Sequence, residues 1–131
     1  MKVIIAGGRN YKFTKDDWEL LNNLHKEYVF TEIISGGATG ADSEGERFAR
    51  KNKIKIVKFE AKWLDFTSPC VIKYNKRGEK YNALAGFKRN EEMAKYGEGA
   101  ILFPGGRGTM NMQKFSKQYD LKIIYDVEEK E

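Results

Sequence analysis

The stretch KVIIAGGR at residues 2–9 points to the fold class, because an apolar run ends directly in two glycines and an arginine. A short, continuous apolar run before glycine is typical of a strand buried on both faces of a parallel sheet. The same arrangement recurs where EIIS at 32–35 leads into GGATGAD at 36–42, and where GAILF at 99–103 leads into PGGRGT at 104–109. We therefore expect three buried strands that end in glycine-rich turns.

Segments of helical period follow these turns. Thr14 is the expected start of the first helix, and Asp17 three residues later completes a capping box. The second helix is expected to begin at Asp42 or Ser43, since either side chain can cap it. A third helical pattern runs over residues 84–96 and ends before a glycine.

Weaker apolar runs at residues 55–59 and 121–125 complete a regular alternation of strand and helix. Such alternation predicts an α/β fold with a five-stranded parallel sheet covered on both faces. Because crossovers are right-handed, we expect a doubly wound sheet of order 3-2-1-4-5. The switch point then lies between strands one and four, and the three glycine turns converge on one crevice.

Length and composition suit one domain over residues 1–131, with 40% hydrophobic residues to form its core. The single cysteine, Cys70, cannot form an internal disulfide, which excludes a disulfide-stapled secreted scaffold. The opening apolar run at residues 3–6 is too short for a signal peptide or a membrane span. We therefore expect a cytoplasmic protein that does not contact a membrane.

The net charge of +5 is unevenly distributed. Residues 50–95 contain 13 Lys or Arg and 5 Asp or Glu, whereas the rest of the chain contains 11 and 14. This basic middle segment fits either an anionic partner, nucleic acid or a phosphate-bearing small ligand, or simply a solvated surface. Its residues 60–82 lack a regular pattern, which indicates a lid or a surface excursion. Within it, Trp63 and Tyr74 are candidates to stack on a base, although Trp63 also suits the core.

Glycine turns between a strand and a helix are suited to phosphate, because the backbone can approach closely and the helix N-terminus supplies free N–H groups. A tight turn without a ligand is the alternative for any one of them. The Walker pattern and the dinucleotide fingerprint are both missing, which excludes the usual kinase, GTPase and dehydrogenase classes. Because no Cys, His or carboxylate cluster has metal-ligand spacing, we predict no metal site. Cys70 has no basic partner to activate it, and we predict no catalytic residue and no cofactor.

Charged side chains near the turns complete the candidate site. Arg9 and Arg107 can pair with phosphate, while Arg89 and Asn90 are expected to open a helix beside the crevice; each arginine also suits a surface salt bridge. Asp42 suits either a helix cap or a ribose hydroxyl. The predicted ligand-binding residues are Gly7, Gly8, Arg9, Gly36, Gly37, Ala38, Thr39, Gly40, Asp42, Arg89, Asn90, Pro104, Gly105, Gly106, Arg107, Gly108 and Thr109.

Four runs together, at residues 3–9, 35–42, 86–93 and 103–109, resemble the SLOG superfamily, and within it the small YspA/YpsA-like branch. The resemblance spans nearly the whole chain, with the four runs in the right order. It implies a Rossmann-like nucleotide-binding fold with the ligand over the glycine turns, and it implies a homo-oligomer.

The superfamily contains several activities, so the resemblance leaves the function open. Its Lonely Guy branch cleaves nucleoside monophosphates and has the motif PGGxGTxxE. Residues 104–109 match this motif, but Met112 stands where the catalytic glutamate belongs, and a thioether cannot act as an acid or base. Glu91 or Glu92 would have to replace it. DNA-processing proteins form another branch, and further members resemble sensors of nucleotide signals in antiphage systems.

The resulting first hypothesis is a binding protein for a small nucleotide or a nucleotide-derived signalling molecule, ADP-ribose-like or cyclic. It would act as a sensor or a sponge, in phage defence or counter-defence. An enzyme that cleaves nucleotides, an N-glycosidase or phosphoribohydrolase, is the first alternative. Binding of single-stranded nucleic acid through the basic middle segment is the second alternative.

Overall fold

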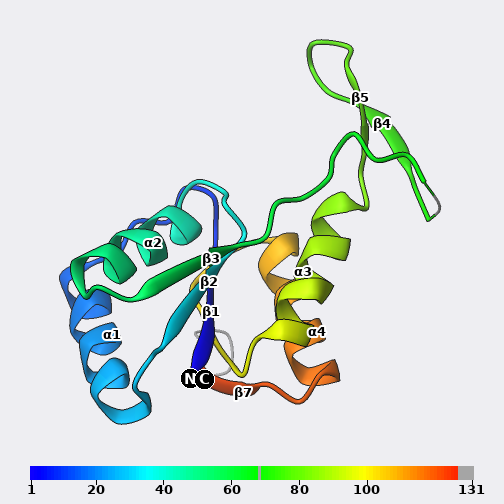
Figure 1. Ribbon diagram of the computed structural model, residues 1–131. Coiled ribbons are helices and arrows are strands. Elements are labelled where there is room, and N and C mark those ends of the chain that lie inside the picture. Colours follow the sequence, from blue (N-terminus) through cyan, green and yellow to red (C-terminus); the bar gives the residue numbers. More distant parts are fainter. Residues whose placement is uncertain (68, 127–131) are drawn as a thin grey trace.

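A computed structural model describes residues 1–67 and 69–126, so residues 68 and 127–131 of the predicted domain lie outside the described residues. Within those ranges, five parallel strands form the main sheet in the order β3-β2-β1-β6-β7, which confirms the predicted doubly wound order (Figure 1). The strands are β1 (Lys2–Ala6), β2 (Glu32–Ser35), β3 (Lys55–Lys58), β6 (Gly99–Leu102) and β7 (Lys122–Asp126).

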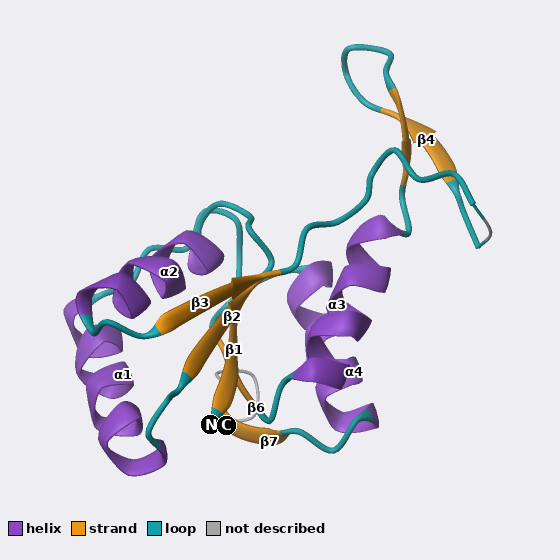
Figure 2. Ribbon diagram, viewed as in Figure 1, coloured by secondary structure: helices purple, strands orange, loops and turns teal. Residues whose placement is uncertain are grey.

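Helices cover both faces of this sheet, as Figures 1 and 2 show. On one face lie α1 (Lys15–Tyr28) and α2 (Ala41–Lys51), and on the other lie α3 (Ala85–Tyr96) and α4 (Arg107–Gln118). In the described part of the chain, none of these helices has the length and apolar character needed to cross a membrane.

The apolar run at residues 3–6 of β1 is explained by burial on both faces of the sheet. Val3 and Ile5 pack into the cluster that includes residues of α1 and α2, whereas Ile4 packs with residues of α3 and α4. Successive side chains of a strand point to opposite faces, so a central strand with helices on both sides needs apolar residues at every position. All three side chains are at most 1% exposed.

The helix starts differ from one another. Thr14 caps α1 and forms the predicted capping box with Asp17. The prediction for α2 was wrong: this helix begins after Gly40 and has no side-chain cap. Asp42 and Ser43 lie one and two residues inside the helix, where both side chains turn back to the backbone of Ala38.

The expected irregular segment contains a two-stranded antiparallel ribbon, β4 (Ile72–Tyr74) with β5 (Lys80–Asn82). The ribbon projects away from the sheet and helices (Figures 1 and 2). Asn82 anchors its base, because this buried side chain donates to the carbonyl of Asp65 and its backbone N–H donates to Trp63. Strands of three residues are too short for a periodic signal, which explains why the sequence pattern did not show them.

Candidate functional site

The turns after β1, β2 and β6 pack directly against one another through their backbones. The N–H of Gly8 donates to the carbonyl of Pro104 at 2.8 Å, and the carbonyl of Gly8 accepts from the N–H of Ala41 at 3.0 Å. A Cβ on Gly40 would overlap that same carbonyl of Gly8, and a Cβ on Gly105 would overlap the hydroxyl of Thr109. The glycines therefore allow three turns to meet at one edge of the sheet.

A cavity of about 840 Å³ opens at this edge. Three of the predicted residues do not line it and instead contact a neighbouring turn or the start of α4: Gly40, Pro104 and Gly105. The predicted residues that do line it are Gly7, Gly8, Arg9, Gly36, Gly37, Ala38, Thr39, Asp42, Arg89, Asn90, Gly106, Arg107, Gly108 and Thr109.

Trp63, predicted as a candidate to stack on a base, also lines the cavity. Other lining residues were not predicted as ligand-binding: Ala6, Lys58, Glu60, Ala61, Met93 and Met112. Lys58, Glu60 and Ala61 lie at or just after the carboxyl end of β3. The rule that parallel strands end at the same edge of the sheet would have placed them there, although no glycine marks this strand end. Met93 of α3 and Met112 of α4 are core residues that also form part of the cavity wall.

The turn before α4 leaves backbone open toward the cavity. Gly106 is the N-cap of α4 and makes no side-chain cap bond. A Cβ placed on Gly106 or Gly108 would meet nothing within 4 Å, and both residues are exposed. The first N–H groups of a helix lack intrahelical partners and lie at its positive end, so this turn is suited to an anion. Thr109 does not cap this helix, because it lies buried two residues inside α4.

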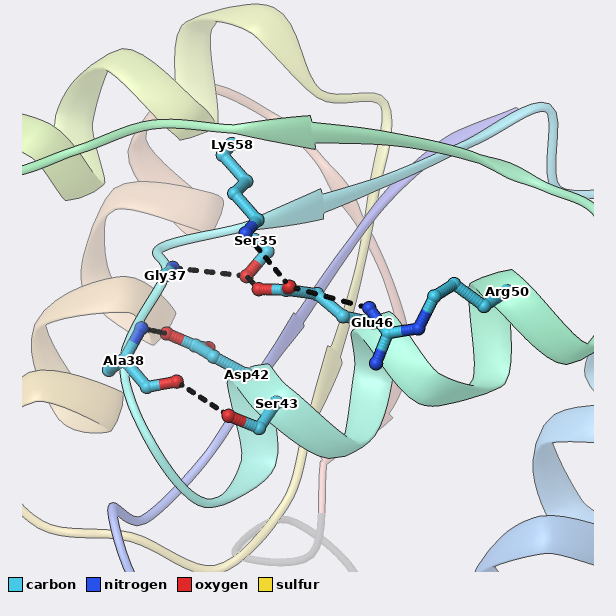
Figure 3. A network of polar contacts seen from close by, with 8 residues as sticks. All are labelled: Ser35, Gly37, Ala38, Asp42, Ser43, Glu46, Arg50 and Lys58. Carbon is cyan, nitrogen blue, oxygen red and sulfur yellow. Dashed lines mark hydrogen bonds and ion pairs between the residues drawn. The ribbon is translucent and has the colours of Figure 1, made fainter.

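A buried network shapes the turn after β2 (Figure 3). The hydroxyl of Ser35 donates to Glu46 Oε2 at 2.6 Å and accepts from the N–H of Gly37 at 3.0 Å. A carboxylate only accepts hydrogen bonds, so the single hydroxyl proton of Ser35 is donated to Glu46. The hydroxyl oxygen of Ser35 then accepts the hydrogen bond from the N–H of Gly37. The network thereby links α2, β2 and a cavity-lining residue.

Glu46 also binds cations from two elements. Its Oε1 lies 3.2 Å from Lys58 Nζ and 3.9 Å from a guanidinium nitrogen of Arg50. Lys58 lines the cavity, so this ion pair positions one cation at the rim. The exposed ends of the two cations keep water contact, and the buried carboxylate is satisfied on both oxygens.

Asp42 lines the cavity beside this network. Its Oδ2 accepts from the N–H of Ala38 at 3.1 Å. Burial raises the pKa of Asp42 above its ordinary value, while that hydrogen bond and the nearby guanidinium of Arg89 partly oppose the increase. A carboxylate that is half-buried at a cavity wall can accept hydrogen bonds from a ligand hydroxyl.

Arg89 and Asn90 link two of the turns from the middle of α3. They lie in the second turn of the helix, so the expectation that they open it was wrong. Arg89 donates through Nη1 to the carbonyl of Gly36 at 2.5 Å and through Nε to Asn90 Oδ1 at 3.0 Å. Asn90 in turn donates to Asn111 Oδ1 at 2.9 Å and to the carbonyl of Gly108 at 3.4 Å. The pair therefore ties the β2 turn to the start of α4.

Carboxylates line the cavity only at Asp42 and Glu60 among the described residues. Glu91 accepts from the hydroxyl of Tyr119 at 2.6 Å, and neither Glu91 nor Glu92 belongs to the lining. Met112 is 1% exposed at the wall. In residues 1–67 and 69–126 there is no group of three or more His, Cys, Asp or Glu placed to hold a metal ion.

Trp63 lines the cavity from the segment that leads into the ribbon and is 40% exposed. The expectation of a core role for Trp63 was therefore wrong. Its ring packs edge-on against Tyr81, with 6.2 Å between the ring centroids. Tyr74, the other candidate for stacking, lies on β4 outside the lining and is 68% exposed.

Comparison with known proteins places this geometry in a family. The model of the YspA, cpYpsA-related SLOG family matches residues 1–66, which include the first two glycine turns. The chain belongs to this family. No curated protein sequence matches the chain significantly.

A solved protein structure has a similar fold. The chain is similar to the X-ray structure of DNA processing protein A (DprA) from Streptococcus pneumoniae, with a TM-score of 0.66 and 21% sequence identity. The match covers 95% of this chain and 49% of that one, so the SLOG chain spans about half the length of the solved protein. At this identity the likeness concerns the fold alone.

Proposed function

We propose that the cavity binds a small nucleotide or a nucleotide-derived signalling molecule, ADP-ribose-like or cyclic, and that the protein acts as a sensor or a sponge for it. The observation that carries this proposal is the convergence of three glycine turns and the open N-terminus of α4 on one cavity. Its volume of about 840 Å³ is in the range of small-molecule sites. SLOG membership supports the same class of ligand.

The lining suggests how such a ligand would be held. A phosphate would lie at the N–H groups of Gly106 and Gly108, with Arg107 pairing from the rim. Asp42 would accept from a ribose hydroxyl, and the exposed ring of Trp63 would stack on a base. Met112 in place of the glutamate of the related hydrolases favours binding without cleavage. A role in phage defence or counter-defence is the biological setting that we propose.

The first experiment identifies the ligand directly. Denaturing the purified protein and analysing the released small molecules by mass spectrometry should reveal a nucleotide. Calorimetry then measures binding of ADP-ribose, cyclic ADP-ribose isomers, AMP and cyclic dinucleotides. Absence of binding to every member of this panel would contradict the proposal.

A matched pair of variants links the binding to the cavity. Gly108 lines the cavity, and a Cβ there would meet nothing within 4 Å outside the neighbouring backbone of its own helix, so we expect the isopropyl group of Gly108→Val to extend into ligand space. We expect at least about 10-fold weaker binding, because the backbone approach to phosphate is blocked. Lys114→Val places the same β-branched residue at an exposed position of α4 and should leave the affinity unchanged. Equal affinities for both variants would place the ligand elsewhere.

Turnover is tested separately. Incubation with nucleoside monophosphates and NAD, followed by chromatography, should show no released base. A released base would support the alternative of an N-glycosidase or phosphoribohydrolase and overturn a role in binding alone.

A further inference from the structure

The ribbon formed by residues 71–82, here called the arm, does not line the cavity and has no part in the function proposed for it. Figures 1 and 2 show it extending beyond the sheet and helices. Ile72 pairs with Asn82, and Tyr74 with Lys80, in antiparallel register. All of β4 is exposed, and only the end of β5 at Asn82 is buried. An isolated two-stranded ribbon buries little, so its own stability does not explain why it is built.

The charge of the arm is strongly one-sided. It contains Lys73, Lys76, Arg77 and Lys80, against Glu79 alone. In the part of the chain that the structure describes, the ion pairs within 4.0 Å join Glu44 or Glu46 to cations outside the arm. The four arm cations therefore have no carboxylate partner there, and Lys80 Nζ lies 4.6 Å from the centroid of the Phe66 ring. No carboxylate neutralises their charge, so it can attract an external anion.

The tip of the arm is ordered by its own hydrogen bonds. Asn75 Oδ1 accepts from the N–H of Arg77 at 2.9 Å and from the N–H of Glu79 at 3.0 Å. Gly78 has a φ of +78°, which suits glycine and completes the turn. Lys76 and Arg77 are thus presented at the far end of a shaped turn, which lowers the entropic cost of binding.

Duplex DNA matches this combination of shape and charge. The major groove of B-form DNA is about 12 Å wide and admits a two-stranded ribbon, whereas the major groove of duplex RNA is too narrow for side chains to read. Ile72 and Tyr74 share one face of β4, where they can contact thymine methyl groups while the cations reach phosphates. Association of two arms with each other would instead bring four cations against four cations.

We propose that the arm binds duplex DNA by entering its major groove, with Lys73, Lys76, Arg77 and Lys80 contacting phosphates. This binding is independent of the small-molecule cavity. It also differs from single-strand binding through the whole basic middle segment, since it requires only the ribbon and its tip.

Fluorescence anisotropy of a short labelled DNA duplex with the full chain tests the proposal. Four phosphate contacts predict a slope of about −3.6 for log K against log salt concentration, or about 150-fold weaker binding between about 50 and about 200 mM salt. The double variant K76Q/R77Q should reduce the magnitude of this slope by about 2.

The matched control is K26Q/K114Q, which removes the same charge from exposed positions of α1 and α4 and should retain the slope. Arg107→Gln at the cavity rim should change the slope by less than about 1, because this residue does not lie on the arm. Thermal melts of all variants verify that they fold.

Several results would overturn the proposal. One is the absence of salt-dependent binding of duplex DNA. Another is an equal loss of DNA affinity in K76Q/R77Q and K26Q/K114Q. A third is a loss of DNA affinity in Arg107→Gln alone, which would place the DNA at the cavity. Tighter binding of single-stranded DNA or duplex RNA than of duplex DNA would also overturn it. So would self-association in light scattering that K76Q/R77Q abolishes while DNA binding is absent, since the arm would then be a protein interface.

Discussion

At the residue scale, Gly37 and Gly40 separate two reasons for glycine in one turn: a left-handed backbone conformation and the lack of room for a side chain. Both have a φ of +74°, which L side chains rarely adopt. A Cβ on Gly37 meets nothing within 4 Å, whereas one on Gly40 would overlap the backbone of Gly8 and Arg9. Only Gly40 therefore combines backbone strain with a steric clash.

This difference predicts an order of stabilities. Gly37→Ala should cost about 1–2 kcal/mol for the left-handed backbone alone. Gly40→Ala should cost about 3 kcal/mol or more, because the two turns must also separate. Gly108→Ala should be neutral or stabilise by about 0.5 kcal/mol, because its Cβ is in open space within a helix. Urea denaturation measures all three, and equal costs for Gly37→Ala and Gly40→Ala would contradict the contact between turns.

Asp42 predicts opposite effects of one substitution on stability and binding. Asp42→Asn removes the cost of burying a charge and keeps an oxygen for the N–H of Ala38, so the fold should gain up to about 1 kcal/mol at neutral pH. The affinity for the ligand should fall about 10-fold, because a neutral amide oxygen is a weaker acceptor. Denaturation and calorimetry on the same variant test both effects. Unchanged affinity would remove Asp42 from the site.

The pH dependence of unfolding has a defined sign for Asp42. Its pKa is raised in the folded protein, so the folded state binds more protons than the unfolded state at pH values between the ordinary carboxyl pKa of 3.8 and the folded value. The contribution of Asp42 to stability is therefore greatest at the acidic end of this window and falls as the pH rises through the folded pKa. The difference between wild type and Asp42→Asn, measured by denaturation across this range, should grow with pH and then level off.

At the element scale, the second helix holds the turn before it through side chains rather than through a cap. Ser35→Ala should destabilise the fold by about 1–3 kcal/mol, because it leaves the N–H of Gly37 and one oxygen of Glu46 without their bonds. Ser43→Ala removes a hydroxyl that donates to the carbonyl of Ala38 at an exposed position and should cost less than about 0.5 kcal/mol. Urea denaturation of the pair distinguishes them, and a similar small cost for both would show that the buried network contributes little.

The helix starts also differ by location. The start of α1 is closed by Thr14 and Asp17. The starts of α2 and α4, which lie at the cavity edge, carry glycine N-caps without side-chain bonds. A side-chain cap would occupy the N–H groups that a ligand anion needs. The open start of α4 is therefore consistent with the proposed site. At α2 the first N–H, that of Ala41, instead donates to the carbonyl of Gly8, and Leu84 at the start of α3 also makes no side-chain cap bond.

At the scale of the whole molecule, a ligand that joins three turns should stabilise the entire fold. Binding only to the folded state contributes about 2.7 kcal/mol at a ligand concentration of 100 times Kd. For a chain of this size we expect the midpoint of thermal unfolding to rise by about 10 °C. Thermal denaturation with and without the identified nucleotide measures it, and an unchanged midpoint at saturation would show that the nucleotide does not bind the folded state.

The fold was largely predictable because its signals are local. The apolar run of β1, the capping box at Thr14 and the glycine that ends α3 each act within a few residues. The crossover rule then converts their order into one sheet topology. The arm was not predictable, because three-residue strands carry no periodic signal and their anchor, Asn82, bonds to Asp65 and Trp63 across the segment.

The amino-acid sequence by itself determined the order of strands and helices and the position of the three glycine turns, since apolar period and glycine content act along the chain. Only the tertiary structure decided which groups meet in and beside the cavity: Glu46 with Ser35 and Lys58, and Arg89 with the backbone carbonyl of Gly36. Such partners lie 11 to 53 residues apart. Hydrogen bonds and ion pairs depend on distances of a few ångströms, and those distances exist only after the elements have packed.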